Sequence, residues 1–104
     1  MIVEYIRYQI PEAEARAFED AYGSAAGSLE ASRHCEGYEI ARCTEDPTAY
    51  TVRIEWDSAE GHMQGFRGSP EFRSFFAAVR PYVDKIEEMR HYDVKTAGPK
   101  EHER

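Results

Sequence analysis

Three side chains of this sequence have the chemistry to move a proton near neutral pH: His62, His91 and Tyr8. An imidazole titrates close to neutral pH, so a histidine can act as a general acid or base. A tyrosine joins an apolar ring to one hydrogen-bonding tip, which suits a pocket for a phenolic compound. Each residue also has a structural interpretation: His62 as a solvated helix residue, His91 in cross-strand ion pairs, and Tyr8 in the core.

Flat side chains in the middle of the chain predict a pocket between the second helix and the sheet. The expected substrate-binding residues are Tyr50, Trp56, Gly65, Phe66 and Phe72. Trp56 could serve equally as a core anchor. Gly61 and Gly65 each cost a helix about 1 kcal/mol relative to Ala. Either the helix packs very closely there, or Gly65 leaves room for a ligand.

The sequence predicts no metal site and no disulfide. Cys35 and Cys43 lie eight residues apart on one expected strand, about 26 Å when extended. A disulfide needs Cα atoms within about 7 Å, so we expect two free thiols. His34, Cys35 and Cys43 are the only grouping of histidine and cysteine, and the two cysteines lie too far apart to share a zinc ion. We find no Gly-rich phosphate loop and no nucleophile motif, which argues against nucleotide-binding and hydrolase functions.

The net charge of the chain limits the classes of partner that it can bind. The 104 residues carry a net charge of −7, and the pI is near 5.1. This acidic balance argues against nucleic acid and anionic membranes, because both require basic patches. No apolar run is long enough to cross a membrane, and the first residues do not resemble a signal peptide. We therefore expect a cytoplasmic protein.

The elements that must position these residues follow from periodicity. Alternation predicts strands over residues 2–10, 38–43, 50–56 and 86–94. Helical spacing predicts one helix over residues 12–31 and a second that opens at Asp57, with Glu60 completing a capping box. Gly68 breaks the second helix, and Ser69 caps its continuation, which ends near residue 80.

The order βαββαβ predicts an α+β, ferredoxin-like fold with a four-stranded antiparallel sheet and both helices on one face. We expect this domain to span residues 1–95, followed by a polar tail over residues 96–104. The chain contains a single leucine, Leu29, so the core is thin. We expect large apolar side chains on the uncovered face and hence a homodimer. A one-residue slip exchanges Tyr5 for Tyr8 on the inner face, and the sequence leaves that choice open.

Four short segments resemble the antibiotic biosynthesis monooxygenase (ABM) family. They are Cys35-Glu36-Gly37-Tyr38-Glu39-Ile40, Asp46-Pro47, Ile54-Glu55-Trp56-Asp57-Ser58 and Gly68-Ser69-Pro70-Glu71-Phe72. The resemblance implies a dimeric α/β barrel in which two sheets pack face to face. It also implies oxidation of aromatic compounds by O2 without a cofactor, since the best-known members of the family act in this way.

Departures from the family pattern keep other functions open. Many relatives carry a histidine where this chain has Gly65. The haem-degrading branch also needs an asparagine, which this chain lacks, and a helical histidine near the positions of Phe75 and Phe76. Our expectation is a cofactor-independent monooxygenase that acts on a small aromatic or quinol-like compound. The alternatives are a non-enzymatic small-ligand-binding module and a partner or accessory domain of the same fold.

Overall fold

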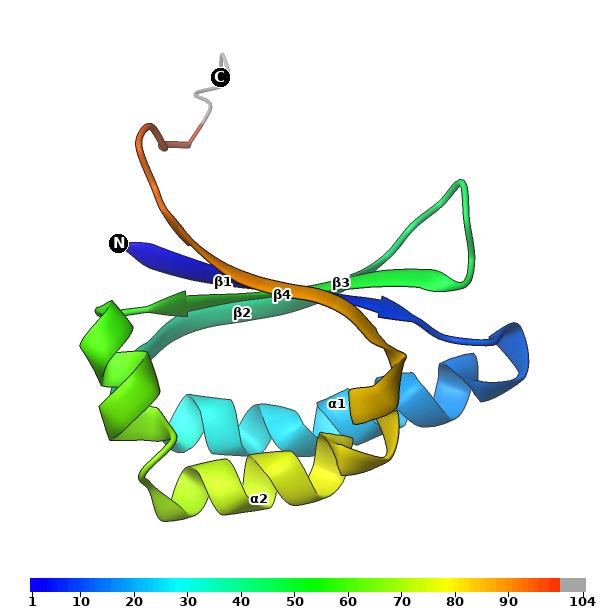
Figure 1. The fold of residues 1–104 in the computed structure, drawn as a ribbon, viewed down its shortest axis with the longest axis horizontal. Helices are drawn as coiled ribbons and strands as arrows, with labels where there is room; N and C mark the ends of the chain where they lie inside the picture. Colours follow the sequence, from blue (N-terminus) through cyan, green and yellow to red (C-terminus); the bar gives the residue numbers. More distant parts are fainter. Residues whose placement is uncertain (100–104) are drawn as a thin grey trace, which may run out of the picture.

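A four-stranded antiparallel sheet carries all the helices on one face, as a computed structural model of the chain shows for residues 1–99 (Figure 1). This confirms the predicted α+β, ferredoxin-like fold. The strands are β1 (Ile2–Gln9), β2 (Cys35–Arg42), β3 (Ala49–Trp56) and β4 (Ile86–Asp93). The helices are η1 (Glu12–Glu14), α1 (Ala15–Ala31), η2 (Gly61–Phe66), α2 (Pro70–Val79) and η3 (Arg80–Lys85). Part of the predicted tail, residues 100–104, lies outside the described residues.

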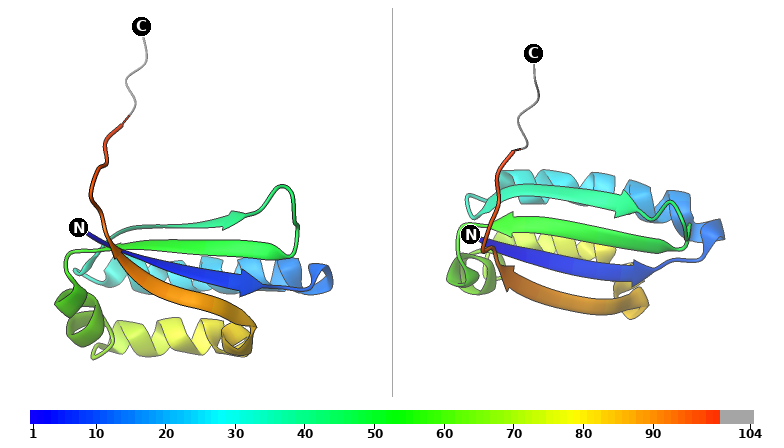
Figure 2. Two further views of the ribbon diagram at one scale, coloured as in Figure 1. Left: turned by 45° about the horizontal axis from the view of Figure 1, so that its top comes forward. Right: turned by 90° about the horizontal axis from the view of Figure 1, so that it is seen from above.

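Strand β1 lies in the middle of the sheet, between β3 and β4, in the order β2-β3-β1-β4 (Figure 2). Its register pairs Ile6 with Val52 and Tyr8 with Tyr50. Ile6 and Tyr8 are buried in the core, whereas Tyr5 lies on the opposite face and packs edge-on against Tyr92. The structure therefore assigns Tyr8, and not Tyr5, to the helix side of the sheet.

The core beneath the sheet is built mainly from aromatic rings. Phe18 of α1 sits at its centre, and its ring centroid lies 4.8 Å from those of Tyr8 and Tyr50. Tyr22 and Tyr82 complete this cluster at 5.2 Å from Phe18. Edge-to-face pairs of this kind add about 1 kcal/mol each beyond simple burial. They offset the scarcity of leucine in the chain.

The segment after β3 differs from the predicted helix. Residues Gly61–Phe66 form a π-helix, a rare form that often marks functional sites. The hydroxyl of Ser58, and not the carboxylate of Asp57, accepts the hydrogen bond from the Gly61 amide at 2.8 Å. The Ser69 cap of α2 is confirmed, since its side chain accepts a hydrogen bond from the Phe72 amide.

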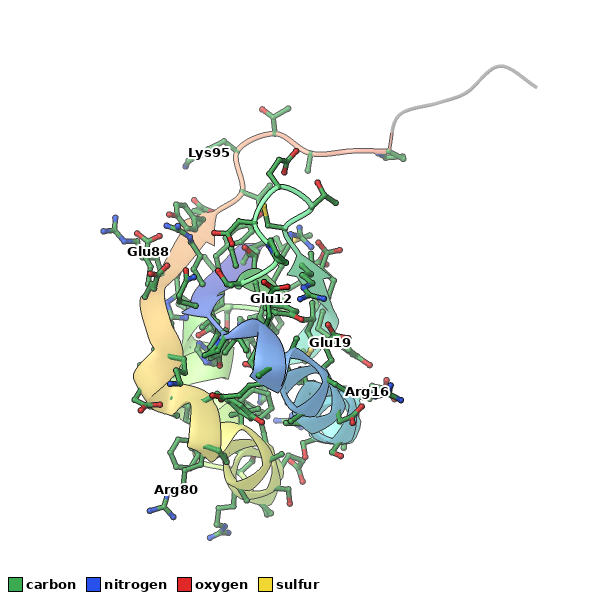
Figure 3. All side chains as sticks on the ribbon, turned by 90° about the vertical axis from the view of Figure 1, so that its right-hand side faces the viewer. Glu12, Arg16, Glu19, Arg80, Glu88 and Lys95 are labelled. Atoms are coloured by element: carbon green, nitrogen blue, oxygen red, sulfur yellow. The ribbon has the colours of Figure 1, made fainter. Side chains whose placement is uncertain are left out.

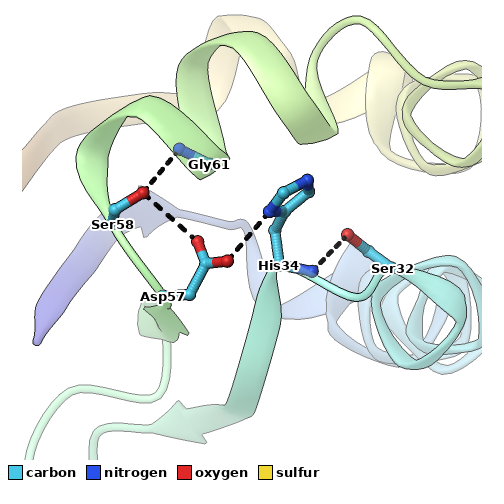
Figure 4. Close-up of polar contacts among 5 residues, drawn as sticks. All are labelled: Ser32, His34, Asp57, Ser58 and Gly61. Atoms are coloured by element: carbon cyan, nitrogen blue, oxygen red, sulfur yellow. Dashed lines mark hydrogen bonds and ion pairs between the residues drawn. The ribbon is translucent and has the colours of Figure 1, made fainter.

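Asp57 instead contacts the His34 imidazole (Figure 4). The two glycines of the helix leave room for this pair. The Asp57 Oδ2 atom lies 2.9 Å from His34 Nδ1. A Cβ atom on Gly61 would overlap the Asp57 carboxylate, and a Cβ atom on Gly65 would overlap the His34 imidazole ring. Close packing therefore explains both glycines, and the expectation that Gly65 gives room to a ligand is not supported.

The uncovered face of the sheet is polar and aromatic, and not apolar as predicted. Arg53 pairs with Glu55 and also donates to the Tyr5 hydroxyl at 3.3 Å. Arg7 pairs with Glu88 on the neighbouring strand at 3.2 Å. Figure 3 shows Glu88 pointing away from the core.

Two further observations concern the cysteines and the helices. Cys35 and Cys43 are free thiols, which confirms their predicted state.

Among the described residues, no helix has both the length and the apolar character that a bilayer crossing requires.

Adding one methyl group at Gly65 should destabilise the fold. The new Cβ would displace the His34 imidazole and break its contact with Asp57. Overpacking of this kind costs about 1–3 kcal/mol. The matched control is Gly23→Ala on α1, where a new Cβ meets nothing within 4 Å; it should stabilise the helix by about 0.5–1 kcal/mol. Urea unfolding measures both changes, and an equal response of the two variants would contradict the packing role of Gly65.

Candidate functional site

A cavity of about 180 Å³ lies between the helices and the β1–β4 side of the sheet. Aromatic side chains form most of its wall: Tyr8, Tyr22, Trp56, Phe66, Phe72 and Phe75. Phe76, Val83 and Met89 also line it, and they are 40–45% exposed. The cavity therefore reaches solvent between α2, η3 and β4.

One end of the cavity holds a buried carboxylate, that of Glu4. This residue is only 3% exposed and occupies a helix-facing position of β1. The indole Nε1 of Trp56 donates a hydrogen bond to Glu4 Oε1 at 3.1 Å. The His62 Nε2 atom lies 3.5 Å from the same oxygen. A carboxylate so deeply buried requires such donors.

His62 links the buried carboxylate to the surface. Its ring stacks on Trp56, with centroids 4.3 Å apart and planes 13° from parallel. Its Nδ1 atom lies 2.6 Å from Nε2 of His91, which is an exposed residue of β4. Since Glu4 and His91 are register partners on adjacent strands, the three side chains form a continuous polar path from the cavity to solvent.

Burial changes the acidity of both inner members of this path. Desolvation raises the pKa of Glu4 above its usual value, against the lowering effect of the Trp56 hydrogen bond. Desolvation also lowers the pKa of His62 to about 4, and His91 and Arg67 contribute to the decrease. His62 is therefore neutral near pH 7, and one ring nitrogen can donate a proton while the other accepts one.

A pair of tyrosine hydroxyls forms a second polar position in the cavity. The hydroxyl oxygens of Tyr8 and Tyr22 lie 2.6 Å apart and are buried. Burial raises the pKa of both phenols, so both stay protonated near neutral pH. They can therefore exchange hydrogen bonds with an oxygen atom of a bound ligand.

The predicted site residues divide into two groups. His62, Tyr8, Trp56, Phe66 and Phe72 line the cavity, and His91 joins them through His62.

Tyr50 and Gly65 lie outside the cavity. Tyr50 packs on Phe18 and donates a hydrogen bond from its hydroxyl to Glu19 of α1, because its place at the start of β3 brings it beside the first half of that helix. Gly65 faces His34.

Sequence reasoning missed Glu4, the most informative residue of the site. A signal was present, because Glu4 interrupts the apolar face formed by Ile2, Ile6, Tyr8 and Ile10. A charged residue on the buried face of a strand usually destabilises a protein unless it is paired, and it often marks a functional site.

The prediction of no metal grouping considered only the cysteines and His34. The fold instead brings donor atoms of Glu4, His62 and His91 within 4.8 Å of one another. One carboxylate and two imidazoles suit a divalent transition metal.

The depressed pKa of His62 predicts a loss of stability in acid. In the unfolded chain this imidazole protonates near pH 6.5, but in the folded chain only near pH 4. The contribution of His62 to the free energy of unfolding is therefore constant above about pH 6.5. It decreases by up to about 3 kcal/mol as the pH falls toward 4, because the unfolded chain then binds a proton that the folded chain does not. Urea unfolding from pH 7 to 4 should show a smaller loss in His62→Gln than in wild type. An NMR titration of His62 with a midpoint at or above 6.5 would contradict this assignment.

Comparisons with known proteins agree with this architecture. Residues 1–78 match the family model "Antibiotic biosynthesis monooxygenase". The uncharacterized protein YczJ of Bacillus subtilis is 27% identical over 92 residues, which cover 88% of this chain and 97% of YczJ.

Two solved structures show the same fold. A conserved protein from Methanosarcina mazei is 22% identical, with a TM-score of 0.75 over 90% of this chain and 92% of its own. A variant of SnoaB, a cofactor-independent oxygenase from Streptomyces nogalater, is 13% identical, with a TM-score of 0.75 over 95% of this chain and 97% of its own. On the strength of the match over residues 1–78, the chain belongs to the antibiotic biosynthesis monooxygenase family.

Proposed function

We propose that this protein is a cofactor-independent monooxygenase that uses O2 to oxidise a small aromatic or quinol-like compound. Family membership supports an activity of this type. The observation that carries the proposal is the aromatic cavity with the buried Glu4–His62 pair at one end. An aromatic wall binds a flat ring, and a buried proton acceptor can activate it.

The size of the cavity limits the substrate. A cavity of about 150 Å³ in another protein holds one benzene ring, and the cavity described here measures about 180 Å³. We therefore expect a compound of one or two rings. Its hydroxyl group would face Glu4, and the paired hydroxyls of Tyr8 and Tyr22 offer hydrogen bonds to another polar group of the substrate.

The first chemical step is removal of a proton from the substrate. Glu4 accepts the phenolic proton, because its raised pKa makes it a stronger base than an exposed carboxylate. His62 passes a proton to His91, which lies at the surface. The electron-rich phenolate stays in an apolar cavity that excludes most water, so that it is not protonated again before it meets O2.

The phenolate then supplies all the electrons that O2 needs. It transfers one electron to O2, and the resulting radical pair combines to form a C–O bond and a peroxide. Loss of the remaining proton from that carbon creates a C=O bond as the O–O bond breaks. The distal oxygen leaves as hydroxide and takes up a proton. One oxygen atom thus enters the product and the other forms water. The ring carbon that carried one hydrogen has become a carbonyl, as has the phenolate carbon, so the product is a quinone.

Metal-chelated, flavin-free protein should consume O2 with hydroquinones and bicyclic quinols, and more slowly with the three-ring anthrone. Glu4→Gln should lower kcat by about 10²–10⁴-fold, because Gln keeps the Trp56 hydrogen bond but cannot accept a proton. The matched control Glu55→Gln, on the uncovered face, should retain activity. An oxygen electrode, corrected for uncatalysed oxidation, gives the rates.

The same assay separates the alternative functions. Aromatic binding without O2 uptake would contradict the oxygenase and establish a small-ligand-binding module. Absence of both binding and uptake would leave a partner or accessory domain.

We also propose that the protein is a cytoplasmic homodimer formed through the uncovered sheet face. The family resemblance implies this arrangement, and the face carries the Tyr5–Tyr92 pair and the Arg53–Glu55 pair. Such aromatic and charged groups suit a polar interface between copies.

Sedimentation velocity at micromolar concentration should therefore show a dimer. Tyr92→Glu should shift it toward monomer, because Tyr92 is 47% exposed on the uncovered face. The control is Met63→Glu, a similarly exposed apolar residue of η2 at 49%, which should leave the dimer intact. A wild-type monomer would overturn this assembly.

A further inference from the structure

We propose that Glu4, His62 and His91 form a binding site for a divalent transition-metal ion, with Zn²⁺ as the representative ligand. This site goes beyond the proposed oxygenase and does not rest on it. The ion would take one oxygen from Glu4 and one nitrogen from each histidine.

The positions of the donor atoms support a single ion. Donors bound to one metal at about 2.1 Å lie about 3.0–3.4 Å apart in octahedral or tetrahedral geometry. Donor atoms of the three residues lie within 4.8 Å of one another, and the closest nitrogens, His62 Nδ1 and His91 Nε2, are 2.6 Å apart. His62 faces His91 with Nδ1 and Glu4 with Nε2, and one ion takes only one of these nitrogens. Binding therefore requires the His62 and His91 rings to reorient from their present contact, which is shorter than the spacing of two ligands on one ion.

The charge balance of the cluster favours a cation. Glu4 is buried, and in the described part of the chain no lysine or arginine nitrogen lies within ion-pairing distance of it. Its nearest ionisable partner is His62, whose Nε2 atom lies 3.5 Å from Glu4 Oε1. Arg67 lines the same cavity but forms no ion pair with Glu4 in the described residues. A buried carboxylate is costly unless a cation pairs with it directly. A divalent ion at this position would provide that direct pairing.

Trp56 holds two of the three ligands in place. Its indole Nε1 donates to Glu4 Oε1 at 3.1 Å, and its ring stacks on His62. Supporting contacts of this kind orient metal ligands and raise affinity. Glu4 and His91 are register partners on β1 and β4, so the sheet fixes the distance between the backbones of these two ligands.

Three protein ligands leave at least one coordination position free. Glu4 and His62 both line the cavity, so that position faces the space where a small ligand would bind. A bound ion would also occupy the lone pairs that the proposed proton transfer uses. We therefore expect Zn²⁺ to compete with the metal-free reaction, and binding must be measured without reference to activity.

Isothermal titration of chelator-stripped, full-length protein with Zn²⁺ tests the site. One ion should bind per chain. Glu4→Gln, His62→Gln and His91→Gln should each weaken binding by about tenfold or more. The matched control is His34→Gln, which removes an imidazole outside the cluster and should leave the affinity unchanged. Circular dichroism verifies that each variant is folded.

Co²⁺ provides a second readout that does not depend on stability. Its visible absorption in wild type should report nitrogen and oxygen ligands in a site of low symmetry, and the spectrum should be lost in His91→Gln, whose mutated side chain is exposed and leaves the core intact. Equal Zn²⁺ affinity in wild type and His91→Gln would overturn the proposal. So would loss of binding in His34→Gln, which would place the ion on His34 and Asp57. Failure of O2 uptake in chelated protein bears only on the oxygenase.

Discussion

Burial of the Glu4 carboxylate is the constraint on which the candidate site depends. Glu4 lies on the helix-covered face of β1 and is only 3% exposed, so its carboxylate must find its partners inside the protein. The indole N–H of Trp56 and the imidazole of His62 provide them at 3.1 and 3.5 Å. Those partners are held in turn by their own stacking, which leaves the carboxylate facing a cavity of aromatic rings.

The π-helix η2 places His62 against this carboxylate, and His34 shapes that helix from the other side. Gly61 and Gly65 have no side chains, which leaves room for Asp57 and for the His34 imidazole beside this helix. Figure 4 shows the contact between His34 and Asp57. The same helix carries His62 and Phe66 on its buried face. Packing at one surface of η2 therefore supports the chemistry at the other surface, although His34 itself lies outside the cavity.

Aromatic side chains form both the core and most of the cavity wall. Edge-to-face contacts favour fixed relative orientations of these rings. The Tyr8–Tyr22 hydroxyl pair adds a neutral polar contact, and the Glu4–His62–His91 path adds an ionisable one. A flat ligand with polar groups matches this distribution. The same path is rich in metal-binding donors, so proton transfer and metal binding would use the same atoms.

The sequence alone determined the strands, the two main helices, the βαββαβ order and the family resemblance, because these depend on local periodicity and short motifs. It also identified His62, Trp56, Phe66 and Phe72 as candidates, since aromatic and imidazole side chains carry recognisable chemistry. Only the tertiary structure decided which face of β1 points inward, because alternation is symmetric under a one-residue slip. It alone separated Tyr50 and Gly65 from the cavity and brought Glu4 beside His62 and His91, because those contacts join residues 29 to 87 positions apart in the chain, and no local pattern specifies such pairings.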